Sequence, residues 1–199
     1  IDIGANQGAM TIIASQALPF NATLIAIEPQ QKLAKCIERS MQENGAKLRW
    51  KVVNAAAGSH ESTSHIVVPS ENFGEAHLSQ DITHATQASK PIHVTTLDIL
   101  LGDIKPGSKI VVKIDVEGYE IDVLNGGRHF ISRTRPIIIL EINPATMRRY
   151  THSITDLRNT LSRLGYKYWK MFGREHDYHS IERLPEWYCD IVLYTAAPV

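Results

Sequence analysis

The sequence predicts an α/β protein with a doubly wound, mostly parallel sheet. Short apolar runs rich in Ile, Val and Leu alternate with segments of helical spacing, which is the pattern of successive β-α units. Three of these runs carry an acid at or near their end: Glu28, Asp115 and Glu141. Two aromatic-rich runs at 166–172 and 187–194 predict an antiparallel pair of strands that closes the sheet.

The chain opens on a short apolar strand followed by a glycine-rich turn, IDIGANQG (residues 1–8). Gly4 and Gly8 permit unusual φ values and close approach of a ligand to the backbone, and residues 9–14 then begin a helix. The spacing is not the Gly-x-Gly-x-x-Gly of dinucleotide-binding turns, and the carboxylate of Asp2 favours a cationic group over a phosphate. A purely structural turn is the alternative. We expect sequence upstream of residue 1 to be missing, which leaves a targeting segment open.

A second buried strand is expected at 23–27, and it ends in Glu28. A carboxylate about 20 residues after a glycine-rich turn is placed to accept hydrogen bonds from the two hydroxyls of a ribose. The alternative is a charged residue that only ends the strand. Pro29 can begin the next helix, whose apolar residues recur at helical spacing until Asn44.

A third strand is predicted at 48–53, followed by the small residues NAAAG at 54–58. A flat ring such as a nucleobase could lie against this backbone, with Asn54 bonded to its edge. Small residues are also common where strands end, and this second interpretation is equally supported.

A short strand at 64–69 leads into a long polar loop at 70–91. Within this loop, FGEAHLS (73–79) combines a glycine, an aromatic ring and the titratable His77, a composition that suits a lid over a site at the strand ends. Surface variability is the alternative. A strand and a short helix are expected at 92–101.

A further apolar strand at 109–114 ends in the acids Asp115 and Glu117, and a helix follows. Because the carboxyl ends of parallel strands meet at one edge of a sheet, we expect both acids to face the same crevice as Asp2 and Glu28. Such an acidic wall suits a cationic ligand or acceptance of a proton. A metal ion is not assigned, because the spacing of His and carboxylates is not diagnostic.

The remaining elements complete the sheet. A fifth strand at 136–142 carries Glu141 and stops before a proline, and a helix follows at 153–165. The aromatic residues of the last two strands are expected to lie in the core.

The composition excludes several classes of protein. Apolar residues make up 43% and charged residues 21% of the 199 residues, which fits one globular domain, residues 1–199. Lys plus Arg and Asp plus Glu are equal at 21 each, so no basic excess points to nucleic acid. No apolar run reaches the ~20 residues of a membrane span. Cys36 and Cys189 lack metal-ligand spacing and are expected to be packed thiols.

In order and spacing these segments resemble the FkbM-type methyltransferases over about residues 1–145. The motifs that carry the resemblance are DIGANQG (2–8), AIEP (26–29), VNAA (53–56), TLD (96–98), KIDVEGYE (113–120), LNGG (124–127) and PIIILE (136–141). The combination of GANQG with KIDVEG is the specific part of the match. The last fifty residues carry little family signal.

The resemblance implies a Rossmann-like fold with a seven-stranded sheet of order 3-2-1-4-5-7-6, an antiparallel C-terminal strand, and S-adenosylmethionine (SAM) as cofactor. In such enzymes the turn holds the methionine part, Glu28 the ribose hydroxyls, and Asn54 with Ala55 the adenine. Carboxylates such as Asp2 and Asp115 favour the cofactor's positive charges. The implied cofactor residues are Asp2, Gly4, Asn6, Gly8, Glu28, Asn54, Ala55 and Asp115.

The expected reaction is O-methylation of a hydroxyl on a small molecule or glycan. Candidate bases are Asp115, Glu117, Glu141 and His77, and the pair Asp115 and Glu117 is preferred. The alternative for Glu117 is to cap the following helix or to pair with Lys113 or an Arg. A rival function is a non-catalytic SAM-binding accessory domain of a larger biosynthetic protein. A nicotinamide-dependent oxidoreductase is disfavoured by the missing third glycine. The acceptor and the oligomeric state stay open, and a cytoplasmic location is favoured.

Overall fold

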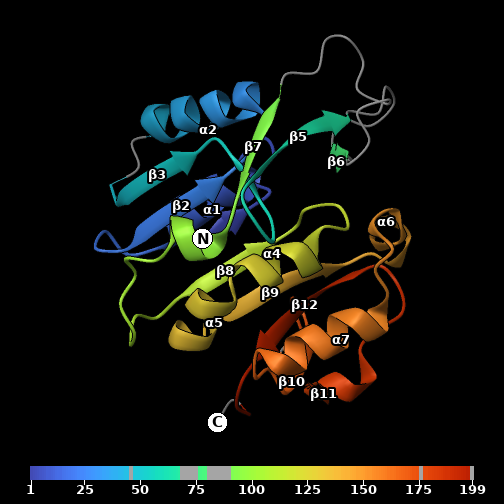
Figure 1. The fold of residues 1–199 in the computed structure, drawn as a ribbon. Helices are drawn as coiled ribbons and strands as arrows, with labels where there is room; N and C mark the ends of the chain where they lie inside the picture. The colour runs from blue at the N-terminus through green and yellow to red at the C-terminus, as the bar shows by residue number, and fades with distance from the viewer. Residues whose placement is uncertain (45–46, 68–75, 80–90, 175–176, 198–199) are drawn as a thin grey trace. The chain divides into compact units, whose positions relative to one another are not determined.

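The structure is a computed structural model that describes residues 1–44, 47–67, 76–79, 91–174 and 177–197. The chain forms two compact units: residues 1–57 with 61–94, and residues 58–60 with 95–199. Both units combine helices with strands (Figure 1), and parallel pairing occurs in both. The predicted α/β class with mostly parallel strands is therefore confirmed, whereas the single domain of residues 1–199 stays a prediction.

The first unit is built on parallel strands with two helices. Its elements are β1 (Asp2–Ile3), α1 (Ala9–Ala17), β2 (Thr23–Ile27), α2 (Gln31–Glu43), β3 (Arg49–Val53), β4 (Ala56–Ala57), β5 (Ser62–Val67), β6 (His77–Ser79) and β7 (Ile92–Thr95). Strand β2 pairs in parallel with β1 on one side and with β3 on the other. Strand β5 pairs antiparallel with both β6 and β7. The order β3-β2-β1 places the ends of β1 and β2 next to each other.

The core of the first unit explains why α2 forms where the sequence predicts it. Ile37 and Met41 are buried one helical turn apart and belong to the same cluster as Leu24 of β2. Cys36 precedes Ile37 and is exposed, so the predicted packed thiol is wrong at this position, whereas Cys189 is buried. The helical phase decides this, because neighbouring residues point about 100° apart around the axis.

The second unit contains the remaining helices and strands. Its elements are α3 (Leu97–Leu100), β8 (Val111–Ile114), α4 (Glu120–Gly126), α5 (Arg128–Thr134), β9 (Ile137–Ile142), α6 (Pro144–Met147), η3 (Arg148–Tyr150), α7 (Ile154–Arg163), β10 (Tyr168–Met171), β11 (His179–Ser180), η4 (Ile181–Arg183) and β12 (Cys189–Tyr194). Strand β9 pairs in parallel with β8 and antiparallel with β12. Strand β10 pairs antiparallel with β12 and with the short β11. Strand β11 has no counterpart among the predicted strands.

Part of the predicted polar loop at 70–91 is a strand. Residues 77–79 form β6, in which His77 pairs with Val67 of β5. Through this pairing the backbone groups at the edge of the sheet gain hydrogen-bond partners. The polar sequence of residues 77–79 does not predict such a strand. Residues 73–75 of the predicted lid lie outside the described residues. Among the described helices, none is long and apolar enough to cross a membrane.

Candidate functional site

The turn between β1 and α1 has the backbone that its glycines predict. We call residues 4–8 the glycine turn. Gly4, Asn6 and Gly8 all have positive φ, at 77°, 51° and 84°, and asparagine is among the side chains that tolerate this region best. A Cβ at Gly8 would also lie 2.8 Å from Cγ1 of Ile37 on α2. Both the backbone conformation and the packing therefore require glycine at position 8.

Glu28 holds the glycine turn against the end of β2. Its Oε2 accepts a hydrogen bond from the Asn6 amide and its Oε1 one from the Gln30 amide, both at 2.8 Å. The side chain is only 3% exposed. The side chain of Gln30 also donates to this carboxylate, so three of its about four acceptor positions are used within the protein. Glu28 therefore has a structural role beside any role in ribose binding.

The surroundings of Glu28 raise its pKa to about 7. Burial is the main cause, because it disfavours the charged form, and the negative charge of Asp2 acts in the same direction. The two backbone hydrogen bonds oppose this shift. The carboxyl group therefore changes its charge near neutral pH.

Asp2 has a buried carboxylate oxygen that the described residues leave unpaired. Its Oδ2 accepts a hydrogen bond from the Thr11 hydroxyl at 2.5 Å, whereas Oδ1 has no partner among the residues that the structure describes. The side chain is 5% exposed. Since a buried charged oxygen without a donor costs free energy, this position favours a cationic or donating group.

Asn54 is committed to the backbone of the same strand end. Its Nδ2 donates to the carbonyl oxygens of Glu28 and Pro29, both at 2.9 Å. The next residue, Ala55, is buried. Asn54 thus positions the segment that carries Glu28, and its contact with an adenine ring stays a prediction.

A second group of acids lies in the second unit. One carboxylate oxygen each from Asp115, Glu117 and Glu141 lie within 4.8 Å of one another, and we call these three side chains the carboxylate cluster. The register explains their proximity, because Ile114 of β8 pairs with Leu140 of β9 and the acids follow directly. Three of the four predicted bases therefore lie close to one another. His77, on β6, belongs to the first unit.

The loop after β8 is held in a strained backbone conformation. Glu117 has φ of 56° and Gly118 has φ of 103°. A Cβ at Gly118 would overlap the backbone of Thr146. Nζ of Lys113 lies 2.6 Å from Oδ2 of Asp115. The alternative roles expected for Glu117 stay predictions.

Glu141 is the buried member of the cluster. It is 6% exposed, and its Oε2 has no hydrogen-bond partner within the described parts of the chain. Burial, together with the charges of Asp115 and Glu117 and then of Glu120 and Asp190, raises its pKa to about 8. Lys113 places a positive charge beside Asp115, another member of the cluster.

The sequence did not single out Glu120 as a functional residue. This side chain is 1% exposed, and its Oε1 accepts hydrogen bonds from the amides of Val116 at 3.3 Å and Gly118 at 3.0 Å. Burial raises its pKa to about 7. Its place at the start of α4 is a signal for this capping role, because acids are favoured near helix N-termini.

The two groups of acids belong to different units. Asp2 and Glu28 lie in the first unit, and the carboxylate cluster lies in the second. The structure brings together the predicted residues within each group. One acidic crevice that contains both groups stays a prediction.

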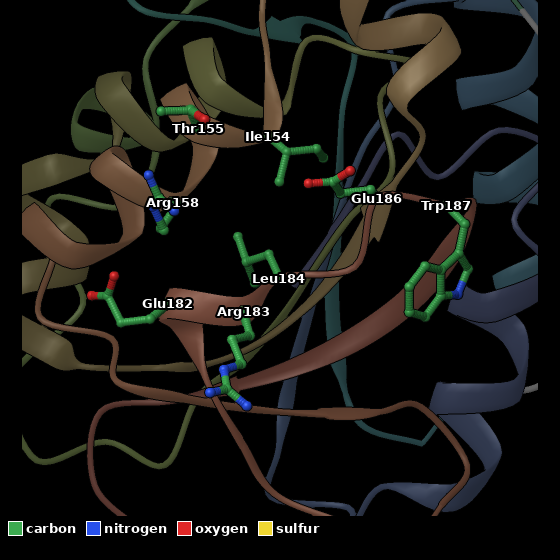
Figure 2. A pocket seen from close by; sticks show the side chains of 8 residues that line it. All are labelled: Ile154, Thr155, Arg158, Glu182, Arg183, Leu184, Glu186 and Trp187. Carbon is green, nitrogen blue, oxygen red and sulfur yellow. The ribbon is translucent and has the colours of Figure 1, made fainter.

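The second unit also has a surface recess of about 530 Å³ (Figure 2). Arg158 of α7, Arg183 of η4, Glu186 and Trp187 are among the side chains around it. Trp187 is 61% exposed, although the sequence predicts the aromatic residues of this region to be core. Trp187 precedes β12, which begins at Cys189, so it has no place in the sheet. Volumes of this size are typical of small-molecule pockets.

The sequence matches the methyltransferase FkbM domain family over residues 2–168. This match covers most of the chain and includes both the glycine turn and the carboxylate cluster. The protein therefore belongs to the FkbM family of SAM-dependent methyltransferases, as the sequence motifs indicate. A search of the curated proteins found no match.

A solved structure of the same family shares the fold. The crystal structure of methyltransferase FkbM from Methylobacillus flagellatus KT is 22% identical, with a TM-score of 0.56 over 97% of this chain. This chain spans 42% of the length of that protein. The O-methyltransferase TomG from Streptomyces achromogenes, crystallised with SAM, is 15% identical with a TM-score of 0.48, and 96% of this chain and 70% of that chain are covered.

Proposed function

We propose that this protein transfers a methyl group from SAM to a hydroxyl group of a small molecule or glycan. Membership of the FkbM family supports the use of SAM. The observation that carries the hydroxyl acceptor is the carboxylate cluster, because two of its members, Asp115 and Glu117, are only partly buried and can be reached by an acceptor. The recess beside Trp187 is a candidate place for part of that acceptor.

We assign the cofactor to the first unit. The glycine turn and the unpaired Oδ1 of Asp2 would hold the methionine part, Glu28 the ribose hydroxyls, and the segment at Asn54 and Ala55 the adenine. When bound, SAM supplies the methyl group on a positively charged sulfur. The negative charges of Asp2 and Asp115 would favour that positive charge.

We also keep one domain with a seven-stranded sheet and an antiparallel last strand as part of this proposal.

The chain's own catalytic tasks are to position the acceptor and to take up a proton. The attacking oxygen must lie in line with the bond that breaks, so much of the rate enhancement comes from positioning. As the new oxygen–carbon bond forms, the hydroxyl proton passes to a base. We assign this role to Asp115 or Glu117, with Glu141 and His77 as further candidates. Lys113, whose Nζ lies 2.6 Å from Oδ2 of Asp115, holds that carboxylate in place.

A methyl-transfer screen tests the proposal. Full-length protein is incubated with SAM that carries a radiolabelled methyl group and with separate pools of glycans, hydroxylated metabolites, amines and thiols. We expect label only in the hydroxyl-bearing pools. Label in the amine or thiol pools would contradict the O-methylation, and SAM binding without any transfer would favour the accessory domain.

The affinity for SAM is expected to fall below neutral pH. Glu28 must be ionised to accept hydrogen bonds from both ribose hydroxyls, and its pKa is about 7 in the free protein. At each pH unit below 7 a proton must leave before binding, so the affinity drops by about tenfold per unit. Isothermal titration at pH 6 and pH 8 measures this difference. Equal affinities at both pH values would exclude Glu28 as the titrating ribose ligand.

A further inference from the structure

Three segments of the second unit carry an excess of positive charge. Residues 97–109, 128–135 and 163–167 contain seven basic residues against two acids, a net charge of +5. Because the whole chain has a formal net charge of zero, the rest of it carries −5. All seven basic residues are exposed, and we call them the basic patch: Lys105, Lys109, Arg128, Arg133, Arg135, Arg163 and Lys167. The balanced composition therefore conceals a strong local charge.

The first two segments are joined by hydrogen bonds. A guanidinium nitrogen of Arg133 on α5 donates to the carbonyl oxygen of Gly102 at 2.9 Å. The carboxylate of Asp98 accepts hydrogen bonds from two backbone amides near the start of α5, at 3.2 and 2.7 Å. One of the two acids is therefore committed to the backbone of α5, and Asp103 is the other.

The third segment meets the other two where β9 begins. Strands β8 and β9 run in parallel and begin side by side, which places Lys109 and Arg135 at one edge of the sheet. Tyr166, which precedes Lys167, donates its hydroxyl hydrogen to the carbonyl oxygen of Pro136 at 2.7 Å. Figure 1 shows α5 and the beginning of β8 on the same side of this unit. The basic patch therefore lies at the amino-terminal ends of these parallel strands.

Exposed isoleucines accompany the charges. Ile99 of α3 is 58% exposed, and Ile137 of β9 is 39% exposed. Ile99 follows Asp98, which contacts α5, and Ile137 lies two residues after Arg135. A partner that binds here gains by covering apolar side chains as well as by neutralising positive charge.

The spread of these charges indicates the chemistry of the partner. A single small anion needs donors that converge on one point, whereas the basic residues come from several elements and are all exposed. A broad anionic surface meets many of them at once. The phosphate backbone of a nucleic acid offers charge but little apolar contact, whereas a lipid surface offers anionic headgroups above an apolar layer. The exposed isoleucines therefore favour a lipid surface.

We propose that the basic patch binds the surface of a membrane that contains anionic lipids. Such peripheral binding needs no membrane-spanning helix, and it places the isoleucines at the level of the headgroups. Asp115 follows β8 and Glu141 lies near the end of β9, so the carboxylate cluster lies at the opposite ends of the same strands. Membrane binding leaves the cluster open to an acceptor. The proposal does not rest on the proposed methyl transfer.

Sedimentation of the full-length protein with lipid vesicles tests this proposal. One set of vesicles contains phosphatidylglycerol and phosphatidylcholine, the other contains phosphatidylcholine alone, and neither SAM nor an acceptor is present. We expect the protein to sediment with the first set and not with the second. Raising NaCl to about 1 M, where the Debye length falls to about 3 Å, should weaken the binding at least tenfold.

A triple variant removes charge from the basic patch. Lys105→Gln, Lys109→Gln and Lys167→Gln keep long polar side chains at exposed positions and remove three positive charges. Each charge near an anionic surface is worth about fivefold in affinity, so we expect the affinity for anionic vesicles to fall about 100-fold. Ile99→Asn should weaken the binding severalfold and leave its dependence on NaCl unchanged, because it removes apolar contact only.

A matched control makes the same chemical change elsewhere. Lys32→Gln, Lys35→Gln and Lys51→Gln remove three positive charges from exposed positions of the first unit, and this variant should bind as the wild type does. Circular dichroism compares the folding of all variants. Where the triple patch variant fails to fold, Lys105→Gln alone replaces it, with an expected loss of about fivefold.

Three results would overturn the proposal. The first is equal binding to both sets of vesicles, and the second is equal binding by the patch variant and its control. The third is the absence of binding to anionic vesicles together with binding of a DNA duplex that the patch variant loses, which would assign the patch to nucleic acid. SAM is titrated into the same samples without vesicles, so that failure of the cofactor site and failure of this surface are seen separately.

Discussion

Replacing Glu28 by alanine is expected to weaken SAM binding by about 1 to 3 kcal/mol, or roughly 5- to 150-fold in Kd. The substitution removes the carboxylate and with it two charge-assisted hydrogen bonds to the ribose. The substitution also leaves the amides of Asn6 and Gln30 without their acceptor, since both donate to Glu28 at 2.8 Å. The glycine turn should therefore become less ordered as well. Isothermal titration with SAM measures the affinity.

A matched control separates these effects from a general effect of removing a glutamate. Glu38→Ala makes the same substitution on an exposed position of α2 in the same unit, and we expect wild-type affinity. Thermal melting of both variants reports the loss of stability. Wild-type SAM affinity in the Glu28→Ala variant would remove Glu28 from the cofactor site.

Replacing Gly118 by alanine should have the largest effect on stability. Its φ of 103° is unfavourable for any L side chain, and a Cβ would overlap the backbone of Thr146, which has no freedom to move aside as a side chain would. We expect a loss of about 4 kcal/mol or more, because strain and overlap add. This corresponds to a fall in melting temperature of roughly 10 °C or more. Differential scanning calorimetry measures it.

Gly107→Ala is the matched control for this substitution. Gly107 has φ of 83°, and a Cβ there would meet no atom within 4 Å. Only the backbone strain is then added, at about 1 to 2 kcal/mol. Equal melting temperatures for the two variants would show that the contact with Thr146 does not constrain the loop after β8.

The sequence predicted the elements whose pattern is local. Strand β2 at Thr23–Ile27 was predicted at its observed bounds, because an apolar β-branched run followed by an acid and a proline has few other structures. The glycine turn was also predictable, since its positive φ values at positions 4 and 8 need glycine. Glu28 was chosen as a candidate site residue because of its distance along the chain from that turn.

Other features depend on contacts between distant residues, which no local pattern contains. Strand β6 forms because β5 offers an edge to a polar segment, and Glu120 is buried because the loop after β8 folds back onto it. The cluster of Glu141 with Asp115 and Glu117 depends on the register of two strands. Trp187 is exposed because it lies before the first paired residue of β12.

Isothermal titration of the full-length protein with SAM and with its demethylated product, S-adenosylhomocysteine, at pH 8 tests the cofactor site most directly. We expect both to bind at a single site and Glu28→Ala to weaken the binding of both. Absence of binding of either compound at millimolar concentration, in protein shown to be folded, would contradict the proposed use of the glycine turn and Glu28 as a SAM site.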